Sequence, residues 1–215
     1  KSYGSLEIFT GVDLAIDRGS RVVILGYNGA GKTTLLRMLA GEETPDTGEV
    51  QAGHGLKLGY FAQEHDTLDQ DASVLDNMRH AAPQLGDTQA RTLLGSFLFQ
   101  GDDVDKPARV LSGGEKTRLA LATLVASSAN VLLLDEPTAG MSPEETFETG
   151  EMVRALNADG VTVLAVEHDM AFVRQIARRV TVLHFGQIFA QGTVEEITAN
   201  DAVAEIYFGH ADHDH

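Results

Sequence analysis

Cysteine is absent from this sequence, and basic residues are scarce beside acidic ones. Without cysteine the chain has neither disulfides nor thiolate metal ligands, which agrees with the reducing cytoplasm in which we expect it. No apolar run reaches the roughly 18 residues that a membrane-spanning helix requires. The 32 acidic and 16 basic residues give a formal net charge of −16. This charge disfavours contact with phosphate backbones, so we expect no direct DNA binding.

The two ends of the sequence support further expectations. The first residue is Lys1, without a methionine or a signal-peptide pattern, so we expect a piece of a longer chain or an engineered one. The last six residues, 210–215, alternate histidine with alanine and aspartate. We expect them to form a disordered polar tail, and weak binding of a divalent cation is the alternative.

Short β-type runs alternate with segments of helical spacing along most of the chain. Residues 66–110 lack the β signal, and we predict a helical subdomain there. The alternation predicts an α/β fold with a mainly parallel sheet flanked by helices, and the early strands suggest an antiparallel β flap beside it. We expect strands at 6–9, 12–16, 21–25, 49–52, 56–61, 131–134, 161–166 and 180–183, and helices at 32–40, 74–80, 89–99, 113–125, 144–156 and 170–177.

The glycine-rich segment at 26–33 fits the pattern G-x-x-x-x-G-K-[ST] between an apolar strand and a helix. Glycines let backbone N–H groups approach phosphate oxygens, and the helix N-terminus directs its positive dipole end at the same anion. Lys32 is suited to contact the β- and γ-phosphates, and Thr33 to bind Mg²⁺. The alternative is a turn without a ligand. Further phosphate-binding candidates are Asn28, Gly29, Gly31 and Thr34.

Two acidic residues, Asp135 and Glu136, end the apolar run 131–134. Carboxylates at the carboxyl end of a parallel strand lie where such sheets bind ligands. Asp135 is the candidate Mg²⁺ ligand, and Glu136 the candidate that polarises the attacking water. Acids at the start of a following helix would explain the same pattern, so the glycine-rich segment upstream carries the interpretation.

A second anion site is predicted where Ser112, Gly113 and Gly114 precede a helix. Ser112 can cap the helix, and the two glycines leave its first N–H groups uncovered. A simple helix cap is the alternative, and the two interpretations are compatible.

Taken in order, these motifs resemble those of ATP-binding cassette (ABC) ATPases over nearly the whole chain. The resemblance also includes Tyr3, Gln63 and His168. It implies a P-loop NTPase fold in which residues 1–215 form a single nucleotide-binding domain with the helical subdomain inserted. It further implies ATP and Mg²⁺ as ligands, and hydrolysis of ATP to ADP and phosphate.

The family pattern assigns a role to each matching position. It implies that Tyr3 stacks on adenine, that Gln63 contacts Mg²⁺ and the attacking water, and that His168 hydrogen-bonds the γ-phosphate. Gln63, Glu136 and His168 would then be the catalytic residues. Residues 112–114 of one cassette would contact the γ-phosphate held by another, so the active unit would be a head-to-tail homodimer or heterodimer.

Two different subfamilies are suggested by the two parts of the chain. Residues 1–138 resemble the second cassette of ABC-F proteins, which are soluble and act on ribosomes. Residues 139–209 resemble importer cassettes for branched-chain amino acids and urea, which act at the inner face of the membrane. A chimera and one divergent cassette both explain this change. The candidate partners are therefore a second cassette together with a membrane permease or a ribosome, and ATP binding alone is the third alternative.

Overall fold

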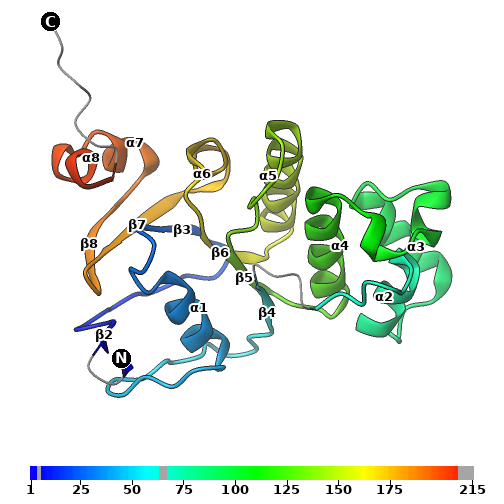
Figure 1. Ribbon diagram of the computed structural model, residues 1–215. Coiled ribbons are helices and arrows are strands. Elements are labelled where there is room, and N and C mark those ends of the chain that lie inside the picture. Colours follow the sequence, from blue (N-terminus) through cyan, green and yellow to red (C-terminus); the bar gives the residue numbers. More distant parts are fainter. Residues whose placement is uncertain (4–5, 63–66, 208–215) are drawn as a thin grey trace, which may run out of the picture.

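A computed structural model describes residues 1–3, 6–62 and 67–207 (Figure 1). Its centre is a sheet of six strands in the order β4-β5-β6-β3-β7-β8. The strands are β3 (Arg21–Gly26), β4 (Leu58–Phe61), β5 (Val131–Asp135), β6 (Thr162–Val166), β7 (Arg179–His184) and β8 (Gln187–Gly192). The first five in sheet order run parallel, and β8 pairs antiparallel with β7. The predicted parallel α/β fold is confirmed.

Helices cover both faces of this sheet, and the buried residues of each strand alternate between them. Leu35 and Leu36 of α1 (Lys32–Ala40) pack with Ile24 and Leu133 on one face. The neighbouring strand residue Leu132 belongs to the core of the opposite face. That face is covered by α4 (Gly113–Ala126), α5 (Pro143–Ala158) and α6 (Met170–Ile176), as Figure 1 shows. The glycine-rich segment and the residues before α4 therefore begin helices on opposite faces of the sheet.

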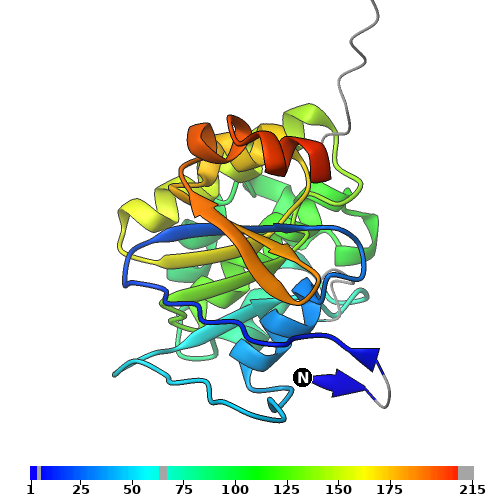
Figure 2. The same cartoon turned by 90° about the vertical axis from the view of Figure 1, so that its left-hand side faces the viewer.

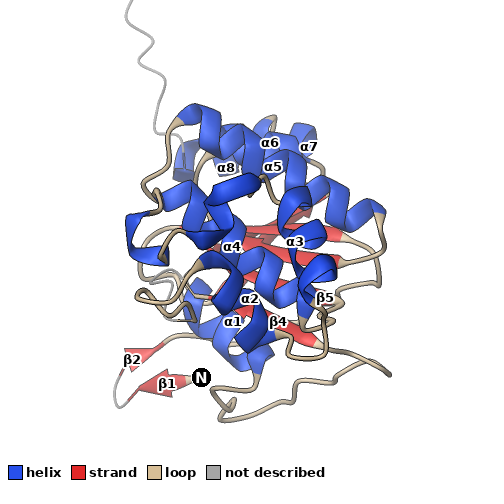
Figure 3. Ribbon diagram, turned by 90° about the vertical axis from the view of Figure 1, so that its right-hand side faces the viewer, coloured by secondary structure: helices blue, strands red, loops and turns tan. Residues whose placement is uncertain are grey.

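The stretch 67–110 contains helices, as its missing β signal predicts. These helices are α2 (Val74–Ala81), α3 (Asp87–Ser96) and the short 3₁₀ turns η1 (Gly101–Asp105) and η2 (Ala108–Val110). Helices α2 and α3 pack against α4, at the end of the molecule that faces the viewer in Figure 3. The predicted helix at 89–99 ends earlier, at Ser96, and Leu98 takes a left-handed φ of 67°.

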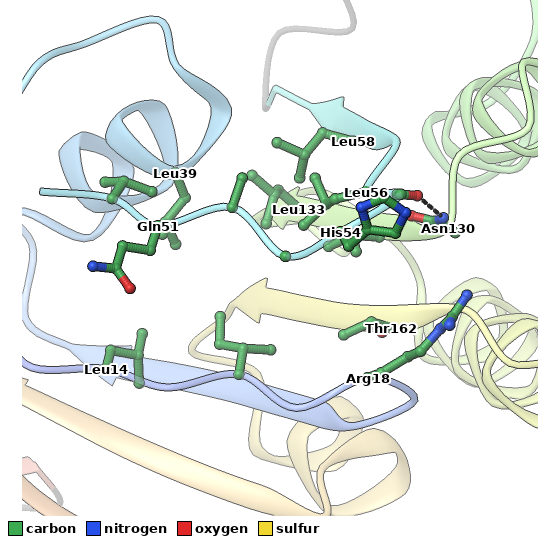
Figure 4. Close-up of a pocket in the computed structure, with 16 residues that line it drawn as sticks. Leu14, Arg18, Leu39, Gln51, His54, Leu56, Leu58, Asn130, Leu133 and Thr162 are labelled. Atoms are coloured by element: carbon green, nitrogen blue, oxygen red, sulfur yellow. Dashed lines mark hydrogen bonds between the residues drawn. The ribbon is translucent and has the colours of Figure 1, made fainter.

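The predicted antiparallel flap is largely wrong. Residues 12–16 and 49–52 form no strands, and β4 joins the parallel sheet beside β5. Glycines account for part of this, because Gly48 and Gly55 take left-handed φ values of 79° and 70° on either side of the second segment. A pocket of about 240 Å³ separates residues 14–18 from residues 50–58, so the two segments do not pair (Figure 4).

The remaining elements lie at the two ends of the chain. Strands β1 (Ser2–Tyr3) and β2 (Leu6–Glu7) pair antiparallel near the N-terminus. Helices α7 (Val194–Thr198) and α8 (Asp201–Tyr207) follow β8, which crosses the view in Figure 2. Tyr207 of α8 stacks on Tyr27, with ring centroids 4.8 Å apart. None of the described helices is long and apolar enough to cross a membrane.

Candidate nucleotide site

Three of the predicted motifs, those that follow β3, β5 and β6, meet at one edge of the sheet because neighbouring parallel strands end there. Strand β3 leads into the glycine-rich loop, β5 ends at Asp135, and β6 leads to His168. In the register of the sheet, Val166 lies beside both Ile24 and Asp135. Strand β4 leads to Gln63, which lies outside the described residues. Carboxyl ends of parallel strands are where such sheets bind ligands, so the topology places a site here.

The glycine-rich loop between β3 and α1 has the backbone that its sequence predicts. Gly29 and Gly31 take left-handed φ values of 82° and 87°. Gly31 also has no room for a side chain, because a Cβ there would lie 2.5 Å from Cγ2 of Ile8. Gly31 caps α1 without a side-chain hydrogen bond to the first turn. The N-terminal N–H groups of α1 therefore face the loop uncovered by a capping side chain, as anion binding requires.

The side chain of Lys32 lies against this loop. Its Nζ donates hydrogen bonds to the carbonyl oxygens of Gly26 (2.6 Å) and Tyr27 (3.0 Å). Burial lowers the pKa of Lys32, and the nearby carboxylates of Glu136 and Asp135 oppose that shift. The ammonium is thus held by two neutral carbonyls inside a loop that can receive phosphate, where an anion would be a stronger partner.

Thr33 and Asp135 come together on adjacent elements. Burial raises the pKa of Asp135. A hydrogen bond between the Thr33 side chain and the Asp135 carboxyl group opposes that shift but is the smaller influence. Oδ1 of Asp135 is buried and has no hydrogen-bond partner among the described residues. A hydroxyl and an unsatisfied carboxylate oxygen beside a phosphate loop suit the oxygen-rich coordination of Mg²⁺. These residues therefore fit the predicted ion.

Glu136 and His168 follow two neighbouring strands. Glu136 has a left-handed φ of 47°, which is rare for a residue with a Cβ, and its N–H bonds the carbonyl of Val166 at 3.0 Å. Oε1 of Glu136 lies 3.9 Å from Nδ1 of His168, whose side chain is 70% exposed. The strained backbone brings the carboxylate toward the histidine, and such strain is common at functional sites.

Sequence reasoning missed a buried carboxylate next to His168. Oε1 of Glu167 accepts hydrogen bonds from the N–H (2.9 Å) and Oγ1 (2.5 Å) of Thr138. Its Oε2 accepts from the N–H groups of His168 (2.9 Å) and Asp169 (3.2 Å). Glu167 is 1% exposed. Its hydrogen bonds join the segment after Asp135 to the segment after β6. A glutamate directly after an apolar strand was the available signal.

The predicted cap of the second helix is confirmed. Oγ of Ser112 accepts the N–H of Glu115 at 3.2 Å, and Oε2 of Glu115 accepts the N–H of Ser112 at 2.8 Å, which makes a capping box on α4. Sequence reasoning missed the partner of the Ser112 hydroxyl, which donates to Oε1 of Glu145 in α5 at 2.5 Å. Gly113 is exposed and Gly114 is buried.

Other predicted residues are not brought to the loop by the described contacts. Tyr3 is 45% exposed. Its ring packs under Nζ of Lys1, and its side chain hydrogen-bonds Glu43, which follows the C-terminal end of α1. Residues 112–114 lie at a helix on the opposite face of the sheet from α1. The tail at 210–215 lies outside the described residues.

Known proteins resemble this chain in sequence and in fold. A family model described as ABC transporter matches residues 9–139. The probable ATP-binding protein YheS of Haemophilus influenzae is 41% identical over 181 residues, which are 84% of this chain and 28% of YheS. The ABC transporter F family member 5 of Arabidopsis thaliana is 38% identical over 182 residues, 83% of this chain and 26% of that protein. The chain thus spans less than a third of these two relatives.

One further relative and one solved structure match over more of their own length. The daunorubicin resistance ATP-binding protein DrrA3 of Streptomyces coeruleorubidus is 35% identical over 214 residues, 93% of this chain and 67% of DrrA3. The ADP conformation of MJ1267, an ATP-binding cassette of an ABC transporter, superposes with a TM-score of 0.80 at 22% identity, covering 97% of this chain and 95% of that one. The chain belongs to the ABC transporter family and is an ATPase cassette of that family.

Proposed function

We propose that this cassette binds Mg-ATP at the loop 26–33 and hydrolyses it at a site completed by residues 112–114 of a second cassette. The observation that carries the proposal is the placement of the two anion-binding helix N-termini. Helix α1 lies on one face of the sheet and α4 on the other. Because one chain keeps them apart, a shared phosphate requires two chains in head-to-tail contact. Two ATP-binding cassette structures similar to this chain, both of MJ0796, are described as dimeric.

The first half of the site binds the nucleotide. The backbone around Gly29 and Gly31, with Asn28 and Thr34 beside it, would surround the phosphates, and Lys32 would exchange its two carbonyl partners for phosphate oxygens. Thr33 and Asp135 would hold Mg²⁺, with Gln63 as a further ligand. The ion, when bound, supplies positive charge to the β- and γ-phosphate oxygens. Tyr3 would supply the aromatic surface for adenine.

The chemical step needs a water molecule aligned with the γ-phosphate. Glu136 is suited to orient and polarise that water, because its carboxylate follows Asp135 directly at the end of β5. His168 lies next to Glu136 and would donate a hydrogen bond to the γ-phosphate, and Gln63 would contact the same water. In the second cassette, the N-terminal N–H groups of α4, the helix that residues 112–114 begin and that we call the signature helix, would stabilise the charge on the transferred phosphoryl group.

We propose two alternative roles for the whole protein. An ABC-F-type role on the ribosome is supported by the similarity to the F family member of Arabidopsis thaliana. A transport role beside a membrane permease is supported by the similarity to DrrA3, which is named for daunorubicin resistance. Either role would put the cassette in the cytoplasm, and the second would put it at the inner face of the membrane.

A chimeric origin, with a junction near Thr138, belongs to the same proposal. It would account for the change of resemblance between residues 1–138 and residues 139–209. The similarity to DrrA3 extends over 214 residues and so includes both parts. One divergent cassette would account for that match equally well.

Mixing two inactive variants tests the shared site. Ser112→Arg blocks the signature helix, and Lys32→Ala removes the phosphate-binding ammonium, so each homodimer lacks any intact composite site. A mixed dimer combines the intact loop of one chain with the intact signature of the other. We expect ATP hydrolysis to return in the mixture. A mixture no more active than either variant alone would contradict the shared site.

A further inference from the structure

The signature helix is already engaged by a carboxylate of its own chain. The Ser112 hydroxyl donates to Oε1 of Glu145 at 2.5 Å, and the backbone N–H of Gly114 also hydrogen-bonds this carboxylate. The approach is close, because a Cβ on Gly114 would lie 2.8 Å from the same Oε1 atom. Glu145 thus occupies two of the donors that, in the proposed function, bind the γ-phosphate of the ATP held by a second chain.

Glu145 is held in this position by the start of its own helix. Its Oε2 accepts the N–H of Ser142 at 3.0 Å, and its N–H donates to Oγ of Ser142 at 3.2 Å. These contacts form the capping box of α5. One carboxylate therefore bridges the N-termini of α4 and α5. The hydrogen bond from Ser112, followed by that from the Ser142 backbone, lowers the pKa of Glu145, so the group is anionic at neutral pH.

An incoming phosphate cannot share these donors with Glu145. A serine hydroxyl has one proton and donates one hydrogen bond, so Ser112 binds either the carboxylate or the phosphate. The two groups are both anionic, and close contact between them would be repulsive. The Glu145 carboxylate would therefore have to leave the N-terminus of α4 before a γ-phosphate could bind there.

We propose that Glu145 is an internal latch: it occupies the signature helix in the free chain and has to release Ser112 and Gly114 before two cassettes close around ATP. This inference rests on the proposed function, since it requires the shared ATP site. The latch raises the ATP concentration at which cassettes associate, and it keeps the signature helix covered while no ATP-loaded partner is present.

The test compares variants in a Glu136→Gln background, where slow hydrolysis lets ATP-bound dimers accumulate. Glu145→Gln keeps the length of the side chain and the capping box but removes the charge. Glu144→Gln is the matched control, because it removes one negative charge from the adjacent, exposed residue. The readout is the ATP concentration at half-maximal dimer formation, measured by light scattering after size exclusion.

We expect Glu145→Gln to lower this midpoint by about tenfold, the typical effect of one hydrogen bond to a charged group. Glu144→Gln should change it by less than about twofold. Glu145→Asp keeps the charge but shortens the reach to Ser112, so it should also lower the midpoint and serves if the glutamine variant folds poorly. An unchanged or higher midpoint for both Glu145 variants would overturn the latch.

Failure of the latch and failure of the shared site give different results. If the parent and its Glu145→Gln derivative associate at equal ATP concentrations, the shared site stands and the latch is wrong. If only the derivative associates, the latch is supported in its strongest form. If both bind ATP and neither associates, the shared site is wrong and the latch falls with it.

Discussion

Glu167 provides the sharpest prediction, because it holds together the segment after Asp135 and the segment after β6. Its two carboxylate oxygens accept four hydrogen bonds, from the N–H and Oγ1 of Thr138 and from the N–H groups of His168 and Asp169. Glu167→Gln has the same shape but replaces one oxygen with an NH₂ group, which donates and does not accept. The substitution therefore leaves part of this network without an acceptor.

The least costly orientation of the new amide sets the magnitude. With its NH₂ toward Thr138, the threonine hydroxyl can rotate to accept, and only the Thr138 N–H is left unsatisfied. The opposite orientation leaves the N–H groups of both His168 and Asp169 unsatisfied. A buried unsatisfied donor costs about 1–3 kcal/mol, and weakening of the remaining charged hydrogen bonds adds to this. We expect a loss of about 2–4 kcal/mol in the free energy of unfolding.

Urea unfolding followed by circular dichroism measures this loss. Glu205→Gln is the control, because this exposed glutamate of α8 loses the same charge, and we expect it to stay within about 0.5 kcal/mol of the parent chain. The double variant with Thr138→Val should show a coupling energy above about 0.5 kcal/mol, since the two residues are in contact. A loss below about 1 kcal/mol for Glu167→Gln would refute the idea that Glu167 holds the segment after Asp135 to the segment after β6.

Two further predictions concern nucleotide binding. Lys32→Ala should lower affinity for a fluorescent ATP analogue by about 100-fold, because it removes the charge that faces the phosphates; unchanged equilibrium binding would contradict the phosphate-loop assignment. Tyr3→Ala should lower that affinity by roughly 3–10-fold through the loss of ring stacking, whereas Tyr3→Phe keeps the ring and should bind as the parent does. Equal affinities for both Tyr3 variants would remove the adenine-stacking role.

Local signals in the sequence predicted much of this architecture. The apolar run 131–134, the spacing at 32–40 and Ser112 before two glycines each determine an element through short-range physics: burial, helical periodicity and capping. The element α1 has the predicted bounds, and Gly41 ends it with a left-handed φ of 79°. The parallel order of the strands follows from the alternation of strands with crossover helices.

Features that depend on long-range contacts were not predictable. β-type residues at 12–16 and 49–52 indicate strands only if a partner lies beside them, and here a pocket separates the two segments. Ser112, which binds Glu145, lies 33 residues from it, and Thr138, which binds Glu167, lies 29 residues from it. Periodicity reports whether a side chain is buried, but it does not report which distant donor satisfies it.

The association state of the Glu136→Gln variant tests the central claim most directly. Glutamine keeps the shape of the side chain but cannot polarise water as a carboxylate does, so ATP should bind and persist. Moderate salt screens the repulsion between two chains of net charge −16. We expect the variant to elute as a dimer with Mg-ATP and as a monomer with ADP. A variant that binds ATP yet stays monomeric, even when Glu145→Gln is added to it, would contradict the shared site, and one that hydrolyses ATP at the parent rate would contradict the role of Glu136.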